Sequence, residues 1–297
     1  ERNPQNIGLV RNWNAVLKKA KGDIVGLFFS DDIFHPQLLE SHLAIMERFG
    51  AQIVSAPGHF ISGDITNLKQ DHYHMDQVYD FTSFFTKKDA FKACLKGDLD
   101  FVACSFIAKK DIIKKVHYFD KSYNFAPDLS FFIKLFGIAD IAFCRIPFHL
   151  RRINEKEYGW LFSENKKTGF TKNKYMIHDI SRLASILKKN FKKLDKKDRV
   201  AHNDYLNKHL FNLYRRILHS YFRMGDRKSI FKYLRKINGT YNLNGQIPFT
   251  AKMLFRIEKL LMILGWLHLF SIYELILFRL EMKLYNYKVN KIFSRKY

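Results

Sequence analysis

The sequence predicts an α/β domain followed by a basic helical region. Residues 24–29 form a short apolar run typical of a buried strand, and amphipathic helical patterns stand before and after it. Charge separates the two regions: residues 1–150 contain 18 Lys plus Arg against 17 Asp plus Glu, whereas residues 151–297 contain 33 against 11. Nearly all of the net charge of +23 therefore lies in the second half.

The first predicted helix and strand occupy the start of the chain. Apolar residues between positions 7 and 17 recur at helical spacing, with Asn6 placed to cap this helix and Gly22 to end it. Apart from one glycine, residues 24–29 are Ile, Val, Leu and Phe, a composition that predicts a strand covered by helices on both faces.

A second helix and strand follow. Pro36 stands where a first helical residue is tolerated, the apolar residues after it fall on one helical face, and Gly50 ends the pattern. Residues 51–56 then predict another short strand. The order of helix, strand, acidic loop, helix and strand is typical of an open α/β sheet.

An acidic pair follows the first strand. Asp31 and Asp32 come directly after Ser30, at the carboxyl end of residues 24–29. Ligands bind at this edge of open α/β sheets. Two adjacent carboxylates repel each other, so a divalent cation that carries a phosphorylated substrate is their natural counter-charge. The alternative is an ordinary loop or helix cap.

Several segments together resemble a known family. They are residues 6–14, 21–25, 29–32 and 36–39, and the resemblance resumes over residues 119–135. These segments resemble the family 2 glycosyltransferases of the Rossmann-like GT-A fold. The resemblance implies an inverting transferase in which Asp31 and Asp32 hold Mg²⁺ or Mn²⁺ against the diphosphate of a nucleotide-sugar. Ser30 stands where the family's DXD motif has its first Asp.

The resemblance also implies a catalytic base and donor contacts. Asp128 follows Pro127 in the first turn of a predicted helix, where the family places its base; the alternative is a helix cap favoured by the helix dipole. Arg11 and Asn12 are candidates for donor contacts or solvated helix residues. Arg152 is a further candidate.

One further candidate segment departs from the family's pattern. Where the family commonly has a His two residues after an Arg, this chain has Asn154 after Arg152. Arg151, Arg152 or His149 could take over that contact.

The beginning of the chain departs from the family as well. The chain begins with Glu1, and the resemblance starts in mid-domain. We expect the amino-terminal strands that hold the nucleotide base and ribose in this family to be missing. Residues 1–155 would then be a partial GT-A domain, truncated at its amino terminus, and residues 156–297 a basic amphipathic helical region.

Smaller clusters carry weaker signals. His72 and His74 alternate like metal ligands but lack partner spacing, so they are more typical of an exposed loop or strand edge. Cys94, Cys104 and Cys144 are widely spaced in apolar surroundings, which favours free thiols in a reducing compartment.

The second half is helical by pattern. Apolar positions recur among Lys and Arg in residues 177–187, 205–221, 229–237 and 251–284. Residues 260–278 are mostly apolar with basic flanks, which suits a helix in the membrane interface; the alternative is a buried helix of a small bundle. A region this basic should meet an anionic partner, and we expect peripheral membrane contact rather than nucleic acid.

These observations favour one function over two others. We expect a cytoplasmic glycosyltransferase, peripheral on the inner face of the cell membrane, that moves a sugar from a nucleoside-diphosphate-sugar to a glycan or lipid-linked acceptor. Bacterial surface polysaccharide or lipooligosaccharide synthesis would fit. The first alternative is an anionic-polymer (nucleic acid) binding protein that uses the basic half. The second is a nucleotidyltransferase that uses the same acidic pair.

Overall fold

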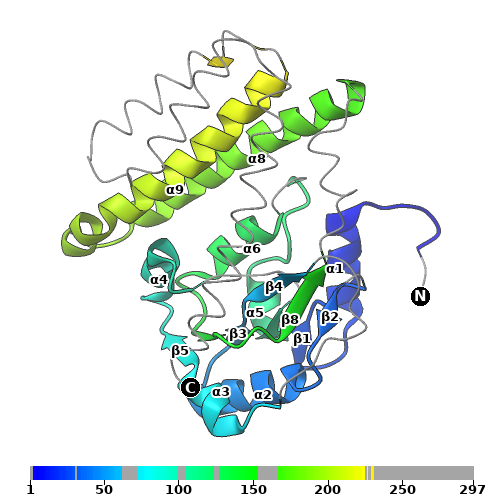
Figure 1. Ribbon diagram of the computed structural model, residues 1–297, viewed down its shortest axis with the longest axis vertical. Coiled ribbons are helices and arrows are strands. Elements are labelled where there is room, and N and C mark those ends of the chain that lie inside the picture. Colours follow the sequence, from blue (N-terminus) through cyan, green and yellow to red (C-terminus); the bar gives the residue numbers. More distant parts are fainter. Residues whose placement is uncertain are drawn as a thin grey trace. The chain divides into compact units, whose positions relative to one another are not determined.

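The chain divides into two compact units (Figure 1). The computed structural model describes residues 3–30, 32–61, 72–99, 105–123, 127–152, 166–224, 226 and 229–230. Within these ranges, the first unit contains every strand and the helices up to residue 135, and the second contains two long helices. The boundary predicted at residue 155 lies outside the described residues.

The first unit is a mixed α/β domain. Its helices are α1 (Leu9–Lys19), α2 (Leu38–Phe49), α3 (Met75–Asp80), α4 (Ala90–Lys96), α5 (Lys110–Lys115) and α6 (Pro127–Leu135). Its strands are β1 (Ile24–Gly26), β2 (Ile33–Phe34), β3 (Ile53–Ser55), β4 (Gly58–Ile61), β5 (Thr82–Phe85), β6 (Phe106–Lys109), β7 (Ile141–Cys144) and β8 (His149–Arg152).

The strands form two sheets. The larger sheet has the order β1-β6-β3-β7-β5, with β3 and β7 parallel and the other pairs antiparallel. The smaller sheet has the order β2-β8-β4, with β8 antiparallel to β2 and parallel to β4. The strand that precedes the acidic pair and the strand that follows it therefore belong to different sheets.

The first helix begins later than predicted, and Asn6 does not cap it. The residue before α1 is Gly8, whose φ of 80° is readily adopted by glycine and rarely by other residues. The Asn6 side chain instead accepts a hydrogen bond from the Gly8 amide at 2.9 Å. On the buried face of α1, the Trp13 ring stacks on Phe29 with centroids 5.1 Å apart, which fixes the helix beside the acidic loop.

The prediction of a strand covered on both faces is wrong for β1. This strand has three residues and lies at the edge of the larger sheet, so Val25 is buried while Ile24 is 39% exposed. The chain leaves the sheet at Gly26, where a Cβ atom would come within 3.1 Å of the Phe106 carbonyl oxygen. An apolar run is compatible with an alternating edge strand as well as with a central one.

The second helix and the strand after it agree with the prediction. Helix α2 ends at Gly50 in the left-handed conformation, with φ of 64°. Strand β3 is buried along its whole length. Both elements contribute to the core of the unit, which includes Leu38, Ile45, Met46, Val54, Ile107, Ala142 and Phe148.

The second unit contains α8 (Lys166–Lys192) and α9 (Lys196–Arg223), which pack side by side (Figure 1). A short turn joins them, and the Asp195 side chain caps α9 by accepting a hydrogen bond from the Asp198 amide at 2.7 Å. The two helices contain the predicted segments 177–187 and 205–221. The segments predicted over 229–237, 251–284 and 260–278 lie outside the described residues, apart from positions 229 and 230.

Across the described ranges, no helix combines the length and the apolar character that crossing a membrane requires.

Candidate active site

Asp32 lies in a buried pair with a histidine. Its carboxylate oxygen Oδ2 is 2.9 Å from Nε2 of His149, and the two side chains are 4% and 0% exposed. A carboxylate removed from water is costly unless a donor or an opposite charge accompanies it. The imidazole N–H of His149 supplies that partner, so the position of the Asp32 carboxylate is fixed.

The smaller sheet brings these two residues together. Strands β2 and β8 pair antiparallel, with Phe34 opposite His149 and Ile33 opposite Leu150. The Phe34 ring stacks on the imidazole of His149, with centroids 5.2 Å apart and an angle of 14° between the ring planes. Asp32 is next to β2 in the chain, and this register places its side chain against His149. Spacing in the sequence could not have revealed the pair, because the two residues are more than a hundred positions apart.

The other half of the acidic pair is not described. Asp31 lies outside the described residues, so of the acidic pair only Asp32 has a described position. Within the described part of the chain, no three His, Cys, Asp or Glu side chains gather closely enough to hold a metal ion. The chemistry of Asp32 nevertheless fits Mg²⁺ or Mn²⁺, because these ions prefer oxygen ligands and are bound through one or two carboxylates plus substrate phosphates.

Asp128 lies in the first turn of α6, where the sequence predicts it. Its Oδ1 accepts a hydrogen bond from the Leu129 amide at 2.8 Å. The helix is held by its apolar face, where the Phe131 ring stacks on Phe119 with centroids 4.2 Å apart and Phe132 meets Phe106 edge-on at 5.4 Å. Asp128 is itself half-buried at the start of a well-anchored helix. This placement is compatible with both a helix cap and a base.

The remaining predicted donor contacts lie on two elements. Arg11 and Asn12 are exposed on α1. The side-chain oxygen Oδ1 of Asn12 accepts a hydrogen bond from the side-chain nitrogen Nδ2 of Asn3 at 2.8 Å. Arg152 is the last residue of β8, three positions after His149 and opposite Ile61 of β4.

The buried side chains of Asn14 and Ser105 form hydrogen bonds with backbone groups. Asn14 is buried, and its amide group donates to the Phe119 carbonyl oxygen at 2.8 Å and accepts from the Phe119 amide at 3.0 Å. Ser105 is also buried and donates to the Ala56 carbonyl oxygen at 2.5 Å. Both side chains join segments that are far apart in the sequence.

The smaller clusters have ordinary surroundings. Both ring nitrogens of His72 lie 3.4 Å from the Gln37 side-chain nitrogen, and His74 precedes α3 as its N-cap residue. Among the described residues, neither Cys94 nor Cys144 forms a disulfide, and burial raises the pKa of the Cys144 thiol to about 11. Cys104 lies outside the described residues.

Comparisons with known proteins identify the first part of the chain. Residues 1–116 match a family model described as "Glycosyl transferase family 2". Among solved structures, S. aureus TarS 1–349 in complex with UDP-GlcNAc is 14% identical, with 79% of this chain and 72% of that chain covered and a TM-score of 0.43. The same protein in complex with UDP is 14% identical over 80% of this chain and 72% of that chain, with a TM-score of 0.39. No curated protein sequence matches the chain.

Proposed function

We propose that this chain, whose residues 1–116 match glycosyl transferase family 2, transfers a sugar from a nucleoside-diphosphate-sugar to a glycan or lipid-linked acceptor. We assign the mixed α/β domain to the GT-A fold, which its strands and helices and the family match support. The proposed reaction inverts the configuration of the sugar and depends on a divalent cation.

The observation that carries the proposal is the placement of Asp32. This carboxylate lies within the family match, follows β1 and is held by a buried histidine from a distant strand. His149 is a side-chain partner that fixes the orientation of the Asp32 carboxylate, as hydrogen-bonding partners do for carboxylates at metal sites.

We assign the metal ligands to Asp31 and Asp32. Mg²⁺ or Mn²⁺ held there would supply positive charge that stabilises the leaving nucleoside diphosphate. His149 acts as a positioning residue, because its ring contacts the carboxylate of Asp32 and is itself held by the stacked ring of Phe34. The proposed donor contacts are Arg11, Asn12, Asp31 and Arg152. These residues belong to α1, the acidic loop and β8.

Asp128 is the proposed catalytic base. An acceptor hydroxyl must lose its proton as it attacks the sugar, and a carboxylate within hydrogen-bond reach can take it. Asp128 lies in the first turn of α6, where its Oδ1 accepts a hydrogen bond from the Leu129 amide at 2.8 Å. The ring contacts of Phe131 and Phe132 anchor α6, the helix that carries this carboxylate.

We propose that the basic second half holds the enzyme at the inner face of the cell membrane, in surface polysaccharide or lipooligosaccharide synthesis. Residues 151–297 contain 33 Lys plus Arg against 11 Asp plus Glu. Basic segments of this kind are attracted to anionic lipid. The same charge would also serve an anionic-polymer binding protein, and that function is the second candidate.

A screen of nucleotide-sugars tests the proposal. The purified protein should release a nucleoside diphosphate from one of them in the presence of Mn²⁺, and EDTA should abolish the release. Release of pyrophosphate from a nucleoside triphosphate would instead indicate nucleotidyl transfer. Tight, salt-sensitive binding of nucleic acid without any turnover of a nucleotide-sugar would favour the second candidate.

A further inference from the structure

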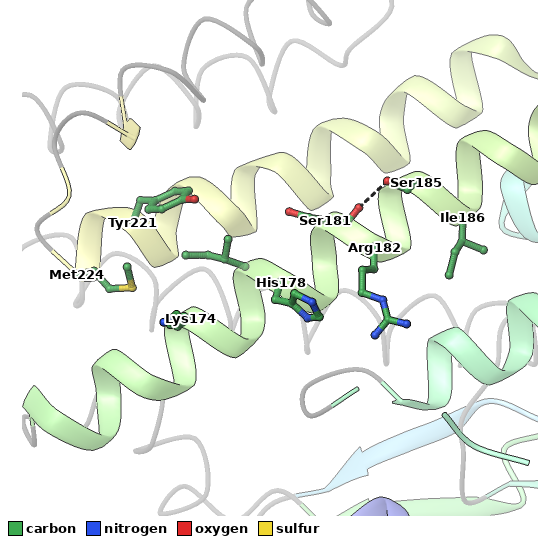
Figure 2. A pocket seen from close by; sticks show the side chains of 9 residues that line it. Lys174, His178, Ser181, Arg182, Ser185, Ile186, Tyr221 and Met224 are labelled. Carbon is green, nitrogen blue, oxygen red and sulfur yellow. Dashed lines mark hydrogen bonds between the residues drawn. The ribbon is translucent and has the colours of Figure 1, made fainter. Parts of the chain in front are cut away.

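The second unit contains a pocket that is lined by none of the residues proposed for the transferase reaction. It has a volume of about 810 Å³ and lies along α8, with its remaining wall from the last turns of α9 (Figure 2). The lining residues are Lys174, Ile177, His178, Ser181, Arg182, Ser185, Ile186, Tyr221 and Met224. This volume is within the range of pockets that take small organic ligands.

One side of the pocket is basic. Lys174, His178 and Arg182 stand four residues apart on α8, and residues at this spacing are neighbours on one helical face. The hydroxyl of Ser185, which donates to the Ser181 carbonyl oxygen at 3.1 Å, lies on the same helix. The pocket therefore offers cationic groups and hydroxyls to an anion.

None of the described residues that line the pocket is acidic. The Asp179 carboxylate lies 3.2 Å from Nδ1 of His178, and Asp179 is fully buried.

The rest of the lining is apolar. Ile177 and Ile186 come from α8, and Tyr221 and Met224 come from the end of α9. A free phosphate ion would leave this surface unused. A nucleic acid strand would meet a single aromatic ring rather than a series of stacking platforms. A molecule with both an anionic head and an apolar chain uses both kinds of surface.

We propose that this pocket binds the phosphate head and the first chain carbons of a phosphorylated lipid. Lys174, His178 and Arg182 contact the phosphate, and the side chains of Ile177, Tyr221 and Met224 contact the apolar chain. This site goes beyond the proposed transferase activity and does not depend on it. It gives the basic half a specific lipid contact in addition to its general attraction to anionic surfaces.

The test uses short-chain lipids that stay monomeric in solution. The full chain is titrated by calorimetry with dihexanoylphosphatidic acid, with dihexanoylphosphatidylcholine and with inorganic phosphate. We expect the phosphatidic acid to bind about tenfold or more tightly than either of the others. Equal binding of inorganic phosphate would overturn the lipid assignment, and absence of phosphatidic acid binding would overturn the site.

A pair of charge-matched variants locates the binding. The double variant Lys174→Gln/Arg182→Gln removes two charges from the pocket, whereas Lys189→Gln/Lys192→Gln removes two exposed charges from the end of α8, outside the pocket. We expect the first to weaken phosphatidic acid binding about tenfold and the second to leave it unchanged. Equal losses in both variants would show attraction to net charge alone and overturn the pocket. Nucleoside diphosphate release by the first variant reports separately on the transferase reaction.

Discussion

The carboxylate of Asp32 occupies a position where an unpaired charge would be costly. Its side chain is almost entirely removed from water, and its partner is His149 on β8, the strand that pairs with β2. Asp128, by contrast, keeps a partly exposed carboxylate at the start of a helix. The two acids therefore differ in the way that their proposed tasks require: cation binding for the fixed Asp32 and proton removal from the acceptor for the more accessible Asp128.

Replacement of Asp32 tests the binding role. Asp32→Ala should abolish Mn²⁺-dependent donor hydrolysis and transfer, because the proposed cation loses a ligand and His149 loses its partner. The measurement is nucleoside diphosphate release at saturating Mn²⁺. Asp23→Ala, which removes an exposed carboxylate from the other end of β1, is the matched control and should keep full activity. Retained activity in a folded Asp32→Ala protein would contradict the assignment.

Replacement of Asp128 separates the base from the cap. Asn at this position can still accept the Leu129 amide hydrogen bond, so Asp128→Asn should preserve the start of α6. It cannot take a proton, so we expect kcat to fall by about 10²–10⁴-fold with KM for the donor nearly unchanged. Steady-state kinetics measure both values. An unchanged kcat would show that Asp128 serves only as a helix cap.

At the scale of elements, pairing between distant segments positions the site. Strand β8 brings His149 to β2, and the Asn14 side chain joins α1 to the backbone that precedes α6 through two hydrogen bonds with Phe119. The Trp13 ring contacts both Phe29, beside the acidic loop, and Phe119. Helix α1 thus links the acidic loop to the segment that leads to the proposed base.

The Asn14 contact is testable by stability. Asn14→Ala leaves the buried amide and carbonyl of Phe119 without these partners, so we expect a loss of about 2–4 kcal/mol in the free energy of unfolding. Urea unfolding measures the change. Asn12→Ala alters the exposed face of the same helix and should change the stability by less than about 0.5 kcal/mol. Equal effects of the two substitutions would show that the Phe119 contacts contribute little.

Local pattern predicted the helices better than the strands. The apolar spacing of residues 38–49 and the glycine after them contain the whole signal for α2, which agrees with the prediction. The predicted segments 177–187 and 205–221 are shorter than α8 and α9, because Lys residues interrupt the apolar pattern in several of the flanking turns. For β1, the apolar run indicated a strand but could not distinguish an edge from a centre.

At the scale of the whole molecule, charge and burial have different distributions. The first unit has a core that includes a neutral histidine, His42, which is fully buried and whose Nε2 lies 3.2 Å from the Ser105 carbonyl oxygen. Burial lowers the pKa of His42 from 6.5 to about 4, and the hydrogen bond to Ser105 opposes the shift. The second half of the chain carries most of the positive charge instead.

The buried His42 predicts a pH dependence of stability. The pKa of His42 is lower in the folded than in the unfolded chain, so the unfolded chain takes up a proton first as the pH falls below 6.5. The free energy of unfolding therefore decreases progressively between about pH 6.5 and about pH 4. The loss amounts to about 3 kcal/mol at most. Urea unfolding between pH 7 and pH 4 measures it.

The variant His42→Gln supplies the reference. Its side-chain amide can still donate to the Ser105 carbonyl oxygen but does not titrate. We expect the stability of the wild-type chain relative to this variant to decline as the pH falls from 6.5 to 4. A difference that stays constant with pH would contradict the lowered pKa of His42.

By itself the sequence determined the family resemblance of the first half, the helices with strong apolar periodicity and the uneven charge, because each of these depends on neighbouring residues or on composition. The tertiary structure alone decided the Asp32–His149 pair, the Asn14–Phe119 contact and the edge position of β1. These features depend on which distant segments meet and in what register. Such pairing is set by the free energy of the whole fold, and no local pattern of residues encodes it.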